Sequence, residues 1–314
     1  MASTAYSVPM YFPPAFGSTQ LSQAQTCAAL VSAAYDQFQQ FMAQKTPDPG
    51  SFTWKWTGPQ SISSSVAIWW IQKWVASEPI GFLASDGAGN AYLVFRGTMS
   101  KADMVADGDF GQLAYGLVDG FGNVSKGYYG IYTNLSLPTA PSGQTTLLSA
   151  INALSNITTF FFTGHSLGAG LSSLAVPDVS TNSNLKPSSV TMVHYNFGSP
   201  RVGDPAFAAA MNTSTSIPTY RVVNTEDLVP MAPPPLSLSG PMLYEHIGTP
   251  VDFTANYGSA TANHSMANTY SYALGNTTNP YNSANVQMTP LADGTGALSR
   301  SVNVTPAGAA IAAP

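Results

Sequence analysis

The chain has 314 residues, of which 44% are hydrophobic but only 8% are charged, and its formal net charge is −5. An average globular domain carries roughly 25% charged residues, so uncharged polar side chains must cover most of this surface. With no basic face, the sequence argues against nucleic acid or another polyanion as a partner. The length allows one large α/β domain or two small ones.

Cys27 is the one cysteine of the chain, which excludes an intrachain disulfide, and no Cys/His cluster has the spacing of a zinc site. Its surroundings, "AQTCAALVSAAYDQF", predict an amphipathic helix over residues 20 to 42 in which the thiol is a small buried group.

The first residues, "MASTAYSVPMYFPPAF", lack the charge pattern and apolar run of a signal peptide, and no apolar stretch reaches transmembrane length. The low charge and the many Ser, Thr and Asn residues favour a secreted protein in its mature form. A cytoplasmic protein is the alternative.

All five tryptophans fall between Trp54 and Trp74. Trp70 and Trp74 are four residues apart, which predicts one buried helix face with Trp69 beside it. The next segment, "IGFLASDGAGNAYLVFRGT" (80–98), predicts two strands joined by a glycine-rich hairpin loop.

A helical segment is expected near 128–136. From residue 147 onward, helices and buried strands alternate, with strands at "ITTFFFTG", "VTMVHYNFG" and "IPTYRVVN". Such alternation favours one mostly parallel sheet wrapped by helices. No domain linker or internal repeat is visible, so we expect a single α/β domain over 1–314, with 281–314 a low-complexity C-terminal tail.

Residues 164–168, "GHSLG", match the pattern G-x-S-x-G, which is a weak signal by itself in a chain rich in glycine and serine. Here an apolar strand precedes the motif and the short helix "LGAGLSSLAVP" follows it. Ser166 is therefore expected on a sharp strand-to-helix turn that lifts its hydroxyl clear of the sheet, with the helix N-terminus beside it. This is the geometry of a nucleophile.

A serine hydroxyl needs a base to accept its proton, and the base needs an acid to orient it. In the strand–turn–helix arrangement the acid and then the histidine follow the serine along the chain. Of the four histidines, only His246 and His264 lie far enough downstream. His246 falls in an extended segment, whereas His264 lies where a loop enters a helix, which favours His264 as the base.

Three acidic residues compete as the partner of this histidine. Asp227 lies just beyond a predicted strand, where a loop at the carboxyl edge of a sheet would begin, and Glu226 is its neighbour. Asp204 precedes "PAFAAAMN" and is better explained as a helix N-cap with Pro205 in the first turn.

Six blocks occur in an order that resembles the class 3 lipase family, the fungal-type triacylglycerol lipases of the α/β-hydrolase fold. They are "VFRGTMSKADMVADGDF", "VSKGYYGIY", "FFTGHSLGAGLSSLA", "YNFGSPRVGDPAFA", "YRVVNTEDLVPMAPP" and "NHSMANTY". The resemblance spans about residues 80 to 270. It implies an α/β-hydrolase domain with a mostly parallel central sheet and a short lid.

The resemblance assigns roles residue by residue. It implies Ser166 as nucleophile, Asp227 as acid and His264 as base. It further implies an oxyanion hole formed by Thr98 and Leu167. Asp107 matches the acidic residue that holds the oxyanion hydroxyl in place once the lid opens. Members of the family that fungi secrete carry disulfides, which this chain cannot form.

The resemblance also places a lid over the serine within residues 98–120. Its expected apolar underside consists of Met99, Met104, Val105 and Phe110. An ordinary surface loop is the alternative. The acidic residues of this segment lack the spacing of a calcium-binding loop, so no metal and no cofactor is expected.

The leading functional prediction is a triacylglycerol lipase that cleaves acylglycerols at a lipid–water interface through a serine acyl-enzyme. A feruloyl esterase and a phospholipase A1 share the motifs and are alternatives within the same fold. A catalytically silent binding protein is the alternative from a different class. The oligomeric state is not predicted.

Overall fold

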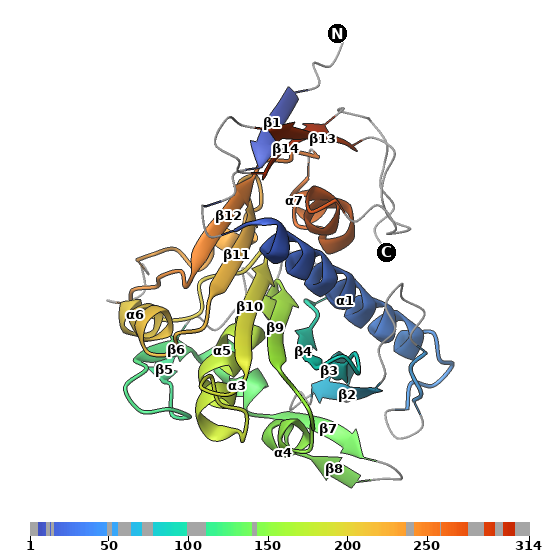
Figure 1. Ribbon diagram of the computed structural model, residues 1–314, viewed down its shortest axis with the longest axis vertical. Helices are drawn as coiled ribbons and strands as arrows, with labels where there is room; N and C mark the ends of the chain where they lie inside the picture. The colour runs from blue at the N-terminus through green and yellow to red at the C-terminus, as the bar shows by residue number, and fades with distance from the viewer. Residues whose placement is uncertain are drawn as a thin grey trace.

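A nine-stranded β-sheet runs through the centre of the molecule and has helices on both faces (Figure 1). The computed structural model describes residues 6–10, 13, 16–48, 52–55, 64–70, 78–98, 111–139, 143–236, 242–257, 259–275, 286–292 and 298–304. The strand order is β12-β11-β10-β9-β4-β3-β2-β7-β8. The strands are β2 (Ser64–Trp70), β3 (Glu78–Ser85), β4 (Asn90–Phe95), β7 (Leu135–Thr139), β8 (Gly143–Thr145), β9 (Thr159–His165), β10 (Thr191–Phe197), β11 (Thr219–Asn224) and β12 (Thr249–Phe253).

The strands from β12 to β4 pair in parallel, and those from β4 to β8 pair antiparallel. The predicted mostly parallel sheet is confirmed. Because parallel strands end at the same edge, the loops that follow β4, β9, β10 and β11 gather there. The helices and helical turns are α1 (Ser18–Met42), α3 (Lys126–Tyr132), α4 (Leu147–Asn152), α5 (Leu167–Asn182), α6 (Pro205–Thr213), η1 (Val229–Met231), α7 (Ala260–Asn263) and η2 (Met266–Ser271).

Most local predictions agree with these elements. The predicted helix over 20–42 is α1, and the predicted hairpin is β3 and β4, which pair antiparallel. Asp204 caps α6 as expected, since its carboxylate accepts a hydrogen bond from the Phe207 N–H at 2.8 Å and Pro205 is the first helical residue. The helix expected near 128–136 is shorter, because α3 ends at Tyr132 and β7 begins at Leu135.

The helix predicted around the tryptophans is wrong for Trp69 and Trp70. Both belong to β2, where they pair with Pro79 and Glu78 of β3 and with β7. The segment "SSVAIWW" is rich in residues that favour strands, and this preference outweighs the four-residue spacing that suggested a helix. Trp74 lies outside the described residues.

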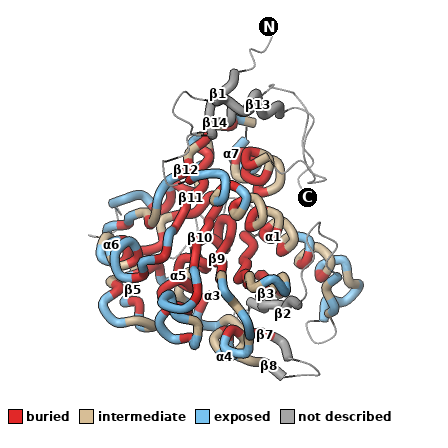
Figure 2. The backbone as a smooth tube through the Cα atoms, in the orientation of Figure 1, coloured by how far each residue is buried: buried red, intermediate tan, exposed pale blue. Residues whose placement is uncertain are grey.

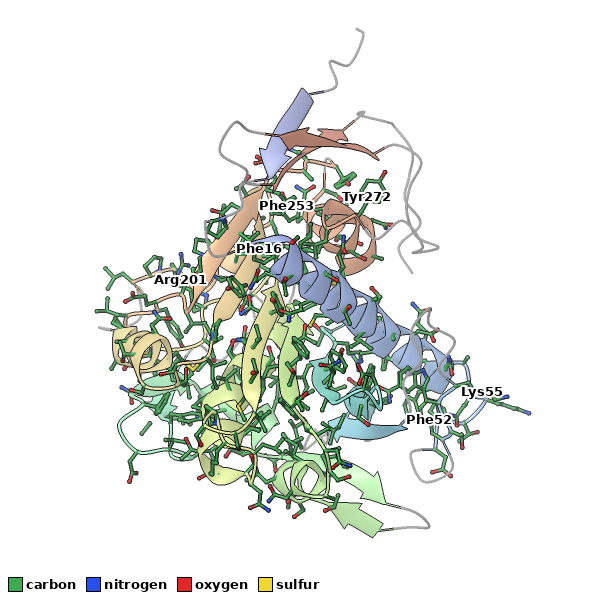
Figure 3. All side chains as sticks on the ribbon, in the orientation of Figure 1. Phe16, Phe52, Lys55, Arg201, Phe253 and Tyr272 are labelled. Atoms are coloured by element: carbon green, nitrogen blue, oxygen red, sulfur yellow. The ribbon has the colours of Figure 1, made fainter. Side chains whose placement is uncertain are left out.

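Both faces of the sheet are buried, and consecutive side chains alternate between two hydrophobic clusters. In β9, Phe160 and Phe162 pack in the cluster that includes α5, whereas Phe161 packs in the cluster that includes α1. The central strands are accordingly buried along almost their whole length (Figure 2). Phe16 and Phe253 belong to the α1 cluster and lie beside the start of that helix (Figure 3).

The helix after the serine motif is longer than expected. α5 has 16 residues, continues past Pro177, and is buried on all sides from Leu167 to Ser180. Its small and apolar residues allow this position in the interior of the molecule. Cys27 of α1 is also buried, as predicted for a structural cysteine, and burial raises the pKa of its thiol.

Two further small sheets complete the described chain. β5 (Gln112–Ala114) pairs with β6 (Asn123–Ser125). β1 (Tyr6–Met10) pairs with β14 (Leu298–Val304), which also pairs with β13 (Val286–Ala292). The segment expected as a low-complexity tail thus contributes two strands. Within the described ranges, no helix combines the length and the hydropathy that a membrane crossing requires.

His194 generates a prediction about acid stability. This β10 residue is fully buried, its ring nitrogen Nε2 lies 2.9 Å from Ser172 Oγ, and burial lowers its pKa from 6.5 to about 3. The unfolded chain binds a proton at this ring below about pH 6.5. The unfolding free energy therefore decreases as the pH falls from about 6.5 toward 3, by up to about 1.4 kcal/mol per pH unit. His194→Gln should make the decline of the unfolding free energy between pH 7 and pH 4 shallower.

Urea unfolding of both proteins at several pH values measures this difference. Plotted against pH, the unfolding free energies of the two proteins should run parallel above pH 7, where the His194 ring is neutral in both the folded and the unfolded state. Curves that also run parallel between pH 6 and pH 4 would contradict the prediction.

Candidate active site

Ser166 lies on the turn between β9 and α5, where the chain passes from strand to helix within one residue. Its φ and ψ angles are 58° and −123°, a combination that a non-glycine residue adopts only when its surroundings hold it there. The backbone N–H of Ser166 donates to the carbonyl of Phe197 in β10 at 3.0 Å. The predicted strand–turn–helix context of the motif is confirmed.

Two glycines allow this turn to close. A Cβ atom at Gly164 would overlap the carbonyl oxygen of Gly168 and lie 2.8 Å from the backbone nitrogen of Ala169. A Cβ atom at Gly168 would lie 2.5 Å from the carbonyl oxygens of both Phe95 and Arg96. The first turn of α5 therefore packs backbone against backbone on β9 and on the end of β4, as only glycine permits.

Asp227 and His264 form a hydrogen-bonded pair. His264 Nδ1 lies 2.6 Å from Asp227 Oδ2. The same carboxylate accepts hydrogen bonds from the Tyr270 hydroxyl at 2.5 Å and from the Val229 N–H at 2.9 Å. Asp227 is 1% exposed, so these bonds hold one rotamer of a buried carboxylate and one orientation of the imidazole beside it.

The pairing with Asp227 leaves the other ring nitrogen of His264 available. Since the carboxylate accepts at Nδ1, that nitrogen carries the proton and Nε2 carries a lone pair. Within the described part of the chain, His264 Nε2 has no hydrogen-bond partner. A buried nitrogen that can accept a proton is thus present at the carboxyl edge of the sheet.

Gly198, the residue after β10, links the pair to the serine turn. A Cβ atom at Gly198 would lie 3.0 Å from His264 Cε1 and 3.2 Å from Asp227 Oδ2, and the residue before it accepts the Ser166 N–H. The ring of His165, beside Ser166 in sequence, packs against the ring of His264 with centroids 4.4 Å apart. These contacts place the Asp227–His264 pair near the turn that carries Ser166, with no hydrogen bond between His264 Nε2 and Ser166 in the described residues.

One candidate oxyanion residue is adjacent to the serine in sequence, and the other follows a glycine that packs against the serine turn. Leu167 follows it at the start of α5 and is buried. Thr98 follows Gly97, whose Cα is so close to the turn that a Cβ atom would lie 2.8 Å from Ser166 Cβ. Asp107 and the expected lid residues Met99, Met104, Val105 and Phe110 lie outside the described residues.

The competing residues have other partners. His246 Nε2 lies 2.8 Å from the Pro230 carbonyl oxygen, and burial lowers the pKa of this ring to about 3. Asp204 caps α6, and Glu226 accepts a hydrogen bond from Asn256 at 3.0 Å. None of these contacts reaches Ser166. Among the described residues, no group of three His, Cys, Asp or Glu side chains could hold a metal ion.

Two tyrosines were missed by the sequence analysis. Tyr270 ends the late histidine block, and its hydroxyl binds Asp227. Tyr35 lies in α1, and its hydroxyl is 2.6 Å from His165 Nδ1. The block ending in Tyr270 was a possible signal for that residue, whereas nothing in the local sequence links Tyr35 to a motif 130 residues away.

His165 is held in its neutral form. Burial, followed by the nearby His264, lowers the pKa of His165 well below 6.5. A neutral ring matters here because it packs directly against the imidazole of His264. A second positive charge at that distance would oppose protonation of His264.

Residues 92–237 match the model of a family described as lipase (class 3). Among curated proteins, a lipase of Rhizomucor miehei is 35% identical over 151 residues, which cover 48% of this chain and 39% of that protein. Phospholipase A1-II 3 of Oryza sativa subsp. japonica is 29% identical over 209 residues, or 60% of this chain and 47% of that protein. The chain thus spans less than half the length of these curated relatives.

Two solved structures share the fold. A triacylglycerol lipase described as having a catalytic centre formed by a serine protease triad superposes with a TM-score of 0.52 at 24% identity, covering 79% of this chain and 84% of that one. M37 lipase superposes with a TM-score of 0.51 at 15% identity, covering 83% of this chain and 95% of that one. The fold is the α/β-hydrolase fold. The family model and the curated relatives agree that residues 92–237 are a class 3 lipase region, as the six sequence blocks predicted.

The glycine contacts lead to a stability prediction. Gly164→Ala should lower the unfolding free energy by about 3 kcal/mol or more, because the new methyl group meets a backbone carbonyl that cannot move alone. Gly130→Ala is the matched control, since this α3 glycine has no atom within 4 Å of the added methyl. It should leave the stability unchanged or raise it by up to about 1 kcal/mol. Chemical denaturation of both variants is the measurement, and equal stabilities would refute the account of the turn.

Proposed function

We propose that this protein hydrolyses carboxylic esters, with Ser166 as nucleophile, His264 as general base and Asp227 as the acid that orients it. The observation that carries the proposal is the strained turn at Ser166, close to a histidine whose Nδ1 is bonded to a buried carboxylate. Such strain is retained where function requires it. A merely structural turn would not need an oriented base beside it.

The geometry allows a two-step reaction. His264 Nε2 accepts the proton of the Ser166 hydroxyl while the serine oxygen attacks the ester carbonyl. Asp227 stabilises the imidazolium that forms. The backbone N–H groups of Thr98 and Leu167 bind the oxyanion. The proton on Nε2 then passes to the leaving alcohol as the carbon–oxygen bond breaks. Water hydrolyses the acyl-enzyme through the same steps, which regenerates the serine.

Triacylglycerols are the substrate class that we favour. The relative in Rhizomucor miehei is a lipase. The loop after Asp227 also exposes large apolar side chains, each about half accessible to solvent. These are Leu228, Met231, Leu236 and Leu243. Exposed apolar side chains in the segment that follows the candidate acid suit contact with acyl chains better than contact with a small polar ester.

Phospholipase A1 activity is the second candidate, because several curated relatives carry that name, among them phospholipase A1-II 3. Both activities release a fatty acid from a glycerol ester, so the same residues serve either.

We also propose a lid within 98–120 that completes the oxyanion hole through Asp107 when it opens. We further propose that the protein acts outside the cell. The low charge of the chain supports an extracellular location.

The nucleophile and the base are tested by three variants. Ser166→Ala should abolish hydrolysis of p-nitrophenyl butyrate, and His264→Ala should lower kcat by several orders of magnitude. His246→Ala is the matched control, because this histidine bonds to Pro230 instead. It should retain kcat within about tenfold. Activity of Ser166→Ala close to that of wild type would remove the serine mechanism.

The substrate class is tested by comparing initial rates on three substrates. Emulsified tributyrin, phosphatidylcholine vesicles and methyl ferulate separate lipase, phospholipase A1 and feruloyl esterase activities. With a lid, activity on tributyrin should rise steeply above its solubility limit, because opening exposes apolar surface that is stable only against lipid. A smooth saturation curve through that limit would count against the lid, and a preference for methyl ferulate would count against a lipase.

A further inference from the structure

A buried arginine lies directly behind the segment that carries Thr98. Arg96 is 0% exposed in a chain that has only ten Lys and Arg residues. Its Nη2 pairs with Glu78 Oε1 at 2.9 Å, and its Nε donates to the Pro79 carbonyl at 2.8 Å. The guanidinium carbon lies 3.8 Å from the ring centroid of Phe38. Burying a charge is costly unless it is paired and hydrogen-bonded, and each nitrogen of this guanidinium has a hydrogen-bond acceptor.

One of these hydrogen bonds of Arg96 is to Gly97. Arg96 Nη1 donates to the Gly97 carbonyl oxygen at 2.7 Å, and the Gly97 N–H donates to the Tyr35 hydroxyl at 2.9 Å. Both peptide groups of Gly97 are therefore bonded to side chains, one to the buried Arg96 and one to the partly buried Tyr35. The residue has no freedom to move sideways either, because it lies against the turn at Ser166.

A trans peptide is planar, and its C=O and N–H point in opposite directions. The carbonyl of Gly97 and the N–H of Thr98 belong to one peptide group. Arg96 pulls the carbonyl toward the interior, and this fixes the N–H of Thr98 on the opposite side. A hydrogen bond from a cation to the carbonyl also polarises the peptide and strengthens its N–H as a donor.

Tyr35 extends this arrangement to the base. Its hydroxyl oxygen accepts the Gly97 N–H, which leaves its own proton to donate to His165 Nδ1 at 2.6 Å. His165 in turn packs against His264. One continuous set of contacts therefore joins Gly97 to the ring of the candidate base.

We propose that Arg96 and Tyr35 are positioning residues that fix the Gly97–Thr98 peptide and thereby aim the Thr98 N–H at the oxyanion. The Arg96–Glu78 pair holds the carbonyl side of Gly97, and Tyr35 holds its N–H side. This inference rests on the proposed ester hydrolysis. It predicts that loss of either side chain weakens binding of the transition state more than binding of the ester.

The test compares an ester with its thiono analogue, in which sulfur replaces the carbonyl oxygen. Oxyanion donors stabilise a developing O⁻ far better than the larger and weaker acceptor S⁻, so the ratio of the two kcat/KM values reports donor alignment. The substrates are p-nitrophenyl butyrate and its thiono form, both below their solubility limits. The variants are Tyr35→Phe and Arg96→Lys, the latter keeping the charge but losing the planar fork.

Each variant should lower kcat for the oxygen ester by about tenfold to a hundredfold with little change in KM. The ratio of oxygen ester to thiono ester should fall at least about threefold. Tyr132→Phe is the matched control, because it also removes a buried hydroxyl, one that donates to Asp178 at 2.7 Å in the interface of α3 and α5. It should lower the melting temperature and leave the ratio unchanged.

An unchanged ratio in Tyr35→Phe, with an active wild-type protein, would overturn the positioning role and leave the proposed function intact. If Arg96→Lys does not fold, Tyr35→Phe alone decides, since it removes a single oxygen atom. An equal fall of both kcat/KM values, as a smaller folded fraction would produce, also overturns the inference. A wild-type protein that cleaves neither ester overturns the proposed function, and the inference with it.

Discussion

The first turn of α5 touches the sheet without any side chain in between, and the rest of the site depends on this contact. Gly164 and Gly168 meet across it, and Gly168 also lies against the end of β4. The contact forces Ser166 into a strained conformation, and it buries α5 on all sides. Because β4 is part of the same contact, the loop that carries Thr98 lies within reach of the serine. A single additional methyl group would separate these elements.

Few charged residues are present in this chain, and two of them, Arg96 and Asp227, are buried near the site. Arg96 pairs with Glu78, and Asp227 with His264. Away from water, such interactions are stronger than they are at the surface, so a small number of charges can fix the geometry of several loops. The neutral state of His165 follows from the same environment, since burial disfavours its protonated form.

Much of this site could be predicted from the sequence, since its signals are local. The motif around Ser166 and the N-cap at Asp204 depend on residues within a few positions of each other. At Trp69 and Trp70 two local signals conflict, because the residue types favour a strand and the spacing of Trp70 and Trp74 favours a helix. Pairing with β3 and β7 decides for the strand. The contacts of Arg96 and Tyr35 were missed for another reason. Tyr35 and His165 are 130 residues apart. The sequence of a helix does not indicate which distant residue will accept a hydrogen bond from a tyrosine hydroxyl on that helix.

The position of α1 has a consequence for how the chain is made. Its apolar face packs on strands β3, β4, β9 and β10 and on η2, and Gln25 donates to the carbonyl of Leu274, 249 residues later. During synthesis this helix therefore emerges long before most of its partners exist. Contacts so distant in sequence form slowly, and exposed apolar surface promotes aggregation in the meantime. The packing of α1 can therefore be completed only after residues beyond 260 have left the ribosome.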